Sequence, residues 1–195
     1  SGTANYGIYI ATPGSISAAG GAITITGTGG ASSANSNHGI VVAGAAGTIT
    51  NTGSGTITLT GTAAGITNSS GNYGLLVNTG AIISTVNGNL TVNNSTGGGA
   101  GSGTTNVGVY ITDTNTTLKT TGSGNIAVTG TGGNPSGSGG SNFGVYCITA
   151  NCLQTTSTGT ITVTGTGGNG SLGSGGTNYG FYIATPGSIT GSGGA

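Results

Sequence analysis

A six-residue stretch, Asn-x-Gly followed by three mostly aliphatic or aromatic residues, occurs six times in this chain and constrains its fold more than any other feature. Successive copies begin 32, 35, 34, 36 and 36 residues apart. A period of this length is typical of architectures in which each unit stacks on the next. The repeat therefore predicts one continuous body over residues 1–195 rather than two globular domains. The copies begin at Asn5, Asn37, Asn72, Asn106, Asn142 and Asn178.

Each unit follows one plan. In the first unit, residues 7–10 and 15–17 are expected to form short strands joined by a turn at 11–14. Residues 22–26 then alternate apolar and polar side chains, as a half-buried strand does. The apolar positions of successive units fall in register, so units stacked in parallel about 4.8 Å apart would form continuous core columns. The pattern predicts an all-β parallel β-helix with three short strands per turn of about 32–36 residues, and five to six turns.

Composition favours order over disorder and narrows the possible partners. The chain has 47 glycines but only two charged side chains, Asp113 and Lys119, and a formal net charge of zero. Disordered segments usually combine low hydrophobicity with high net charge, whereas here aliphatic residues recur at fixed places. No basic patch is available to neutralise phosphates, which argues against nucleic-acid binding, and no apolar run approaches the roughly 18 residues of a membrane span. A neutral surface favours self-association, because like molecules do not repel each other.

A longer period overlies the short one. Residues 1–22 match residues 174–195 at 16 of 22 positions, with an offset of 173. The sequence carries no segment that reads as a cap at either end, although solenoids usually need caps for solubility. We therefore expect either a window of a longer array with a super-repeat of 173 residues, or a unit that stacks end to end.

This organisation resembles the repeat regions of large secreted bacterial β-helical proteins: filamentous-haemagglutinin-like adhesins, autotransporter passengers and β-strand-repeat proteins. The Asn-x-Gly strands and segments such as Gly-Thr-Ile-Thr-Val-Thr-Gly-Thr-Gly-Gly at 159–168 carry the resemblance over the whole length. It is a likeness in the style of repeat and includes no catalytic motif. It implies a right-handed β-helix, export to the cell surface or beyond, and a surface or filament role.

The repeat asparagine is a candidate for a buried turn ladder, in which each side-chain amide bonds to backbone and to the asparagine of the next turn. The alternative is an ordinary exposed turn residue. Glycine doublets such as 20–21, 29–30, 132–133 and 167–168 are expected at bends that need positive φ.

Cys147 and Cys152 are the only cysteines and lie on either side of one predicted turn. A disulfide between them would close that corner and implies an oxidising compartment, with a contribution of roughly 2 kcal/mol in the chain-entropy model. Two free buried thiols are the alternative. Two cysteines and the distant His38 are too few ligands for a metal site, and no cofactor is expected.

Catalysis is close to excluded by the inventory of side chains. Sugar-cleaving β-helix enzymes need at least two carboxylates and this chain has one, Asp113. His38 occupies a position where other turns have Tyr6, Tyr73, Phe143 and Tyr179, so it is expected to be a stacking ring.

Two outward arrays remain as candidate surfaces. The first, which we call the stripe, faces away from the core of the first strand and is apolar or aromatic in every turn. Such a stripe is a candidate interface, unless the corner loop of each turn covers it. Its members are Tyr9, Val41, Leu76, Tyr110, Tyr146 and Tyr182. The second array consists of threonines on the third strand, as in ice-binding solenoids, but threonine is also an ordinary choice on a β surface.

The sequence thus favours a non-enzymatic structural protein that forms an extracellular fibre, stalk or sheath by self-assembly, end to end and possibly side by side. An adhesin or glycan-binding surface module is the alternative, and an ice-binding protein is a minor one. A secreted, extracellular or cell-surface location is expected in each case.

Overall fold

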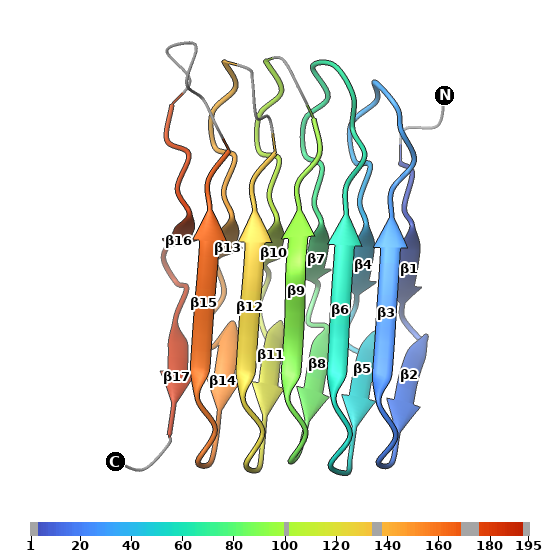
Figure 1. Ribbon diagram of the computed structural model, residues 1–195, viewed down its shortest axis with the longest axis vertical. Coiled ribbons are helices and arrows are strands. Elements are labelled where there is room, and N and C mark those ends of the chain that lie inside the picture. Colours follow the sequence, from blue (N-terminus) through green and yellow to red (C-terminus); the bar gives the residue numbers. More distant parts are fainter. Residues whose placement is uncertain (1–3, 100–101, 134–137, 169–175, 193–195) are drawn as a thin grey trace.

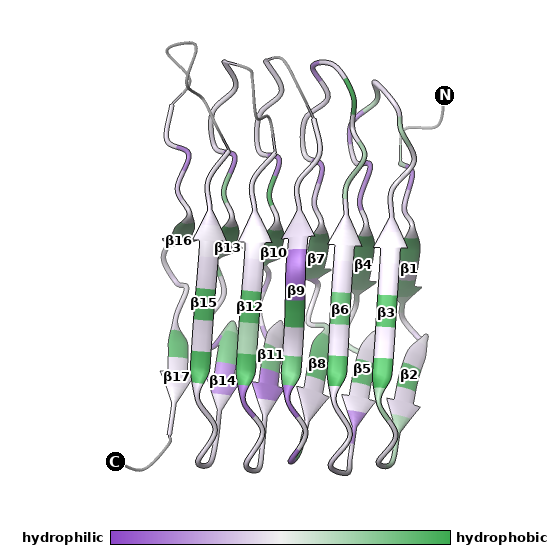
Figure 2. Cartoon of the chain, viewed as in Figure 1, coloured by the Kyte–Doolittle hydropathy of each residue, from purple (hydrophilic) through white to green (hydrophobic). Residues whose placement is uncertain are grey.

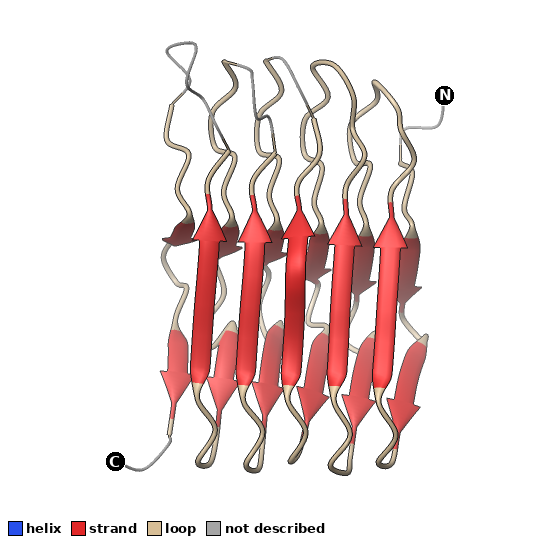
Figure 3. Cartoon of the chain, in the orientation of Figure 1, coloured by secondary structure: helices blue, strands red, loops and turns tan. Residues whose placement is uncertain are grey.

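The computed structural model describes residues 4–99, 102–133, 138–168 and 176–192, and in these residues it contains strands, turns and loops but no helix (Figure 3). The strands form three parallel sheets, with every pairing between one turn of the coil and the next. The predicted parallel β-helix with three strands per turn is confirmed. It comprises five complete turns and the first two strands of a sixth.

The sheets are named here in the order in which the chain enters them. Sheet A contains β1 (Ile8–Ala11), β4 (Ile40–Ala43), β7 (Leu75–Asn78), β10 (Val109–Ile111), β13 (Val145–Cys147) and β16 (Phe181–Ile183). Sheet B contains β2 (Ser15–Ala18), β5 (Thr48–Asn51), β8 (Ile82–Thr85), β11 (Thr117–Thr120), β14 (Leu153–Thr155) and β17 (Ile189–Gly191). Sheet C contains β3 (Ile23–Thr28), β6 (Ile57–Thr62), β9 (Leu90–Thr96), β12 (Ile126–Thr131) and β15 (Ile161–Thr166).

Figure 1 shows how the sheets enclose the core. Sheet C forms the near face, while sheets A and B follow one another on the far face with their strands running opposite to those of sheet C. The solenoid axis runs across the view, from the first turn on the right to the last on the left. Apolar bands lie at the same level in neighbouring strands of sheet C (Figure 2), as expected when equivalent residues stack.

The core consists of columns of aliphatic side chains, one from each turn. In sheet B the column Ile49, Ile83 and Leu118 is fully buried, and the register pairs each residue with its neighbour in the next turn. Exposure rises at the ends, where Phe181 and Ile183 of the sixth turn are 37% and 40% exposed. The core of each turn is therefore completed by its neighbouring turns.

The glycine of the repeat motif is required by a close approach of backbones. It lies where the start of a sheet A strand passes the end of a sheet C strand. A Cβ on Gly74 would lie 2.6 Å from both the Thr96 amide nitrogen and the Gly108 carbonyl oxygen, which is closer than real Cβ contacts. An alanine cannot fit there without moving backbone.

The prediction of positive φ at the glycine doublets is wrong. Among described glycines, positive φ occurs at Gly44, Gly71, Gly80 and Gly99. Five members of the doublets are constrained by close packing instead, because a Cβ there would lie within 3.0 Å of backbone atoms: Gly29, Gly132, Gly133, Gly167 and Gly168. Gly20 and Gly21 have open space around them. Packing of one turn against the next, and not turn conformation, selects glycine at most of these bends.

Candidate functional site

The six repeat asparagines form one column along the solenoid. Asn5 Nδ2 donates to Asn37 Oδ1 at 2.7 Å, Asn37 Nδ2 to Asn72 Oδ1 at 3.0 Å, and Asn72 Nδ2 to Asn106 Oδ1 at 2.7 Å. Further along, the backbone nitrogens of Asn106 and Asn142 donate to the side-chain oxygens of Asn142 and Asn178, at 2.9 and 2.8 Å. The four central asparagines are fully buried. Each turn is thus tied to the next by amide groups shielded from water.

Rings at the second position of the motif and the tyrosines of the stripe together form one connected set that runs along the solenoid. Tyr6, His38 and Tyr73 stack face to face, with ring centroids 5.0 and 4.7 Å apart. Tyr73 then meets Tyr110 of the stripe edge-on at 5.1 Å, and Tyr110 stacks on Tyr146 at 4.9 Å. All seven tyrosines, Phe143 and His38 belong to this one connected set of rings. It extends from the first turn to the sixth.

The stripe is not a continuous exposed surface. Val41 and Leu76 are only 3% and 8% exposed, whereas Tyr9 at the first turn is 58% exposed. Tyr110, Tyr146 and Tyr182 are half-buried. The two aliphatic members, Val41 and Leu76, belong to the turns whose motifs have His38 and Tyr73 at the second position. Any interface on this face is therefore divided between an exposed tyrosine at one end and three stacked tyrosines at the other.

Burial controls the ionisation of the rings in this set. Desolvation lowers the pKa of His38 from 6.5 to about 4, and His38 Nδ1 accepts a hydrogen bond from the Tyr73 backbone nitrogen at 3.1 Å. That acceptor role requires the neutral imidazole with its proton on Nε2. Desolvation, followed by repulsion from Tyr110 and Tyr146, raises the pKa of Tyr73 to about 12. These two rings are uncharged over the physiological pH range.

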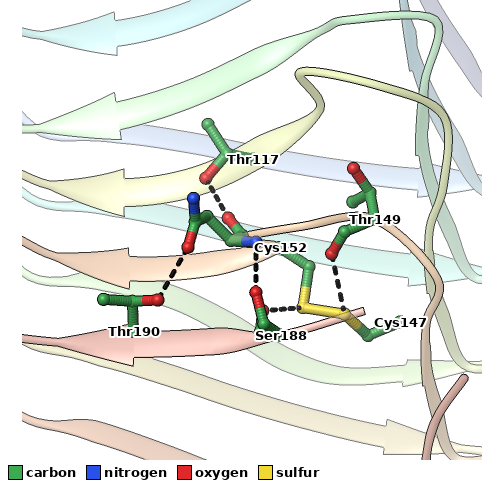
Figure 4. The surroundings of a disulfide bond; sticks show 7 residues. Thr117, Cys147, Thr149, Cys152, Ser188 and Thr190 are labelled. Carbon is green, nitrogen blue, oxygen red and sulfur yellow. Dashed lines mark hydrogen bonds between the residues drawn. A yellow bond between two sulfur atoms is a disulfide. The ribbon is translucent and has the colours of Figure 1, made fainter. Parts of the chain in front are cut away.

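The disulfide predicted between Cys147 and Cys152 is confirmed, with the two Cα atoms 6.2 Å apart (Figure 4). Cys147 pairs in register with Ile111 and Ile183, so it occupies a core position. The Cys152 backbone nitrogen donates to the Ser188 carbonyl of the next turn at 3.0 Å. The bond closes the turn between β13 and β14, and no other turn among the described residues has such a bond.

Threonine dominates the outer face of sheet C. Thr24, Thr58 and Thr91 align in one column, and Thr28, Thr62 and Thr96 in another. The column between them is broken at β9, where the register shifts and Asn94 has a φ of 44°. Ala127 interrupts the first column. The array is regular over β3 and β6 but not over the whole sheet.

A surface hollow of about 560 Å³ lies at the corner between sheets A and B, lined mainly by residues of the fourth and fifth turns together with Ile82 of the third and Pro186 of the sixth. Its lining includes Asp113, Lys119 and Gln154, which are the only aspartate, lysine and glutamine of the chain. The sequence-based prediction did not place these side chains together. The signal was present, because Lys119 and Gln154 interrupt a register column that otherwise carries Ser17, Thr50, Ser84 and Thr190.

The described residues contain no group of three or more histidine, cysteine, aspartate or glutamate side chains that could hold a metal ion. In the same part of the chain, no helix has the length and hydrophobicity needed to cross a bilayer. Comparison with protein-family models, curated proteins and solved structures found no match to this chain. Its class, a parallel β-solenoid built from sequence repeats, is therefore defined by its own sequence and fold.

Proposed function

We propose that this chain is a non-enzymatic structural protein that forms an extracellular fibre, stalk or sheath by end-to-end stacking of its solenoid. The observation that carries the proposal is the register of the stack, in which every strand pairs with its equivalent in the next turn while the asparagine and ring columns run in the same direction. Phe181 and Ile183 occupy core positions in β16 but are more than one third exposed, and β16 pairs with β13 on one side only. An apolar strand edge of this kind is a template for another strand.

The first turn offers a matching edge. β1 pairs only with β4, and its residues Ile8, Tyr9 and Ile10 correspond to Phe181, Tyr182 and Ile183 of β16. In a head-to-tail stack, β16 of one copy would pair with β1 of the next and β17 with β2. Apolar side chains would then continue the core columns, and tyrosine would continue the ring set across the junction. Neither edge carries a charged side chain that would oppose the contact.

The proposal includes a secreted or cell-surface location and a relationship in style to the repeat regions of large bacterial adhesins and autotransporter passengers. The disulfide supports this location, because such bonds persist in oxidising compartments. The near-absence of charge supports packing of filaments side by side, since neutral surfaces do not repel each other.

Assembly can be tested by electron microscopy and sedimentation of the purified chain over a range of concentrations. We expect filaments with an axial spacing of about 4.8 Å between strands. Ile183→Lys places a charge in the open end and should abolish them. Thr60→Lys adds the same charge on the outer face of sheet C, away from both ends, and should leave them intact. Filaments that persist in Ile183→Lys, or a wild-type chain that stays monomeric at all concentrations, would rule out stacking through β16.

An adhesin or glycan-binding module is the second candidate, favoured by the stacked tyrosines Tyr110, Tyr146 and Tyr182, which are half-buried and border solvent. Aromatic faces and their hydroxyl groups suit sugar rings. Binding of glycans by the monomeric Ile183→Lys variant on a glycan array would favour this function over a purely structural one.

Ice binding is a minor candidate that rests on the threonine columns of β3 and β6. The break at β9 argues against a lattice match over the whole sheet. Thermal hysteresis of the purified chain at millimolar concentration would support it, and its absence would exclude it.

A further inference from the structure

The hollow between sheets A and B is the one place where this chain departs from its own repeat in several ways at once. It holds the only aspartate, the only lysine and the only glutamine, and it borders the only pair of cysteines. Elsewhere the outward positions of sheet B carry small hydroxyl side chains such as Thr50 and Ser84. A structural repeat alone does not require these exceptions, because the neighbouring turns fold without them.

Two side chains in the hollow are available to a ligand. Lys119 and Gln154 are register partners on β11 and β14, and both are half-buried. Neither side chain has a hydrogen-bonding or ionic partner among the described residues. Lys119 also forms no ion pair with Asp113, so its ammonium group is not neutralised within the described part of the chain. A free cation and a free amide thus stand side by side on one wall.

Asp113 supplies a fixed acceptor. Its Oδ2 accepts from the Thr79 backbone nitrogen at 2.9 Å and from Thr79 Oγ1 at 3.4 Å, and its Oδ1 accepts from Thr112 Oγ1 at 3.3 Å. These bonds orient the carboxylate and leave one lone pair, on Oδ1, for a further donor, since each carboxylate oxygen can accept two hydrogen bonds. The residue itself is exposed.

The lining also includes the loop closed by the disulfide, residues 148–151. Asn151 is held on three sides. Its carbonyl oxygen accepts from Thr117 Oγ1 at 2.7 Å, its backbone nitrogen donates to Ser188 Oγ at 2.8 Å, and its Oδ1 accepts from Thr190 Oγ1 at 2.7 Å. A loop fixed in this way loses little conformational freedom when a ligand binds, which favours affinity.

The chemistry of the walls points to a sugar that carries a carboxylate. Ile82, Ile148 and Pro186 provide apolar surface for a ring, Gln154 and Asp113 can bond its hydroxyl groups, and Lys119 is the single cation for an acid group. The volume lies within the range of small-molecule sites, about 300–1,000 Å³. We propose that this hollow binds an acidic saccharide, such as a uronic acid residue, with the carboxylate on Lys119. The site does not depend on fibre formation and can be tested on a monomer.

The test uses D-galacturonate and its neutral counterpart D-galactose, which differ only at C6, with acetate as a carboxylate that lacks a sugar. Binding to the Ile183→Lys variant, chosen to remain monomeric, is followed by NMR titration at low salt. We expect galacturonate to bind at least about tenfold more tightly than galactose, because its carboxylate can form a charge-assisted hydrogen bond with Lys119 where galactose has a neutral hydroxyl group. This preference should shrink as salt is added.

Two variants return the hollow to residues that other turns already use. Lys119→Thr restores the residue of Thr50 and should remove the preference for galacturonate over galactose. Cys147→Ile with Cys152→Ser reproduces Ile183 and Ser188 of the sixth turn. This double variant should bind both sugars more weakly while its far-UV circular dichroism is unchanged. Thr60→Ala, on sheet C, is the matched control and should bind like the parent. The proposal is overturned if galacturonate binds no better than galactose or acetate, or if Lys119→Thr keeps the preference.

Discussion

His38 shows how a single residue of the repeat is tuned by its neighbours. The side chain is 4% exposed between two tyrosine rings, and its Nδ1 accepts from the Tyr73 backbone nitrogen. Protonation would place a charge in this buried stack and remove the acceptor. The folded protein therefore holds His38 neutral, with a pKa of about 4.

We predict that stability falls when the pH is lowered through this range. The folded pKa of about 4 lies below the unfolded value of 6.5, so the unfolded chain takes up the proton first. The contribution is complete above pH 6.5 and is lost progressively down to about pH 4, with a total near 3 kcal/mol at about 1.4 kcal/mol per unit. Urea unfolding at several pH values measures it.

The control for this prediction is His38→Phe, which keeps a ring like that of Phe143 but cannot be protonated. Its free energy of unfolding should change much less between pH 6.5 and pH 4. Other groups should add little to the pH dependence of the free energy of unfolding in this range, since Asp113 is the only carboxylate side chain. Equal losses in the parent and in His38→Phe would show that another group is responsible.

At the scale of the turn, the buried asparagines tie one unit to the next. Asn72 uses both ends of its amide: Oδ1 accepts from Asn37 at 2.9 and 3.0 Å, while Nδ2 donates to Asn106 Oδ1 and to Ser69 Oγ at 2.7 and 3.0 Å. The turn is therefore stabilised by contacts made on both sides.

We predict that Asn72→Ala lowers the free energy of unfolding by at least about 2 kcal/mol, because it leaves the Asn37 backbone N–H and the buried Ser69 hydroxyl group without the Asn72 amide, at roughly 1–3 kcal/mol each. Asn35→Ala removes one exposed acceptor, for the Ser70 backbone nitrogen, and should cost less than about 1 kcal/mol. Chemical denaturation of both variants gives the comparison. Similar small losses in the two would mean that water replaces the buried bonds of Asn72.

The strands could be predicted from the sequence because the repeat presents each of them five or six times. Core columns such as Ile49, Ile83 and Leu118 follow from a period-2 pattern in register, and the disulfide follows from two cysteines across one turn. The reason for glycine at the bends was missed, since the backbone of another turn, invisible in the local sequence, excludes the Cβ. The sequence left open whether the stripe is exposed or covered, and only the structure shows that Val41 and Leu76 are buried.

At the scale of the whole molecule, each turn contacts mainly the turns before and after it. Strand pairing links each strand to its equivalents in neighbouring turns, and the asparagine, ring and aliphatic columns follow the same direction. Stability in such a solenoid is approximately a sum over turns and their interfaces. The hollow could not be predicted from the repeat, because its lining includes Asp113, Lys119 and Gln154, which each occur in only one turn.

This modularity predicts that one whole turn can be removed. Deletion of residues 72–105, which is 34 residues and one motif period, joins Gly71 to Asn106 and leaves β6 facing β12 in the same register as before. The shortened chain should keep its β-type circular dichroism, with a urea m-value lower by roughly a fifth, since m scales with the surface exposed on unfolding. Deletion of residues 72–88 removes only part of a turn and brings Asn89 to the place of the motif asparagine. That chain loses β7 and β8, so sheets A and B are interrupted and it should fail to fold. Equal behaviour of the two deletions would contradict a solenoid built from interchangeable turns.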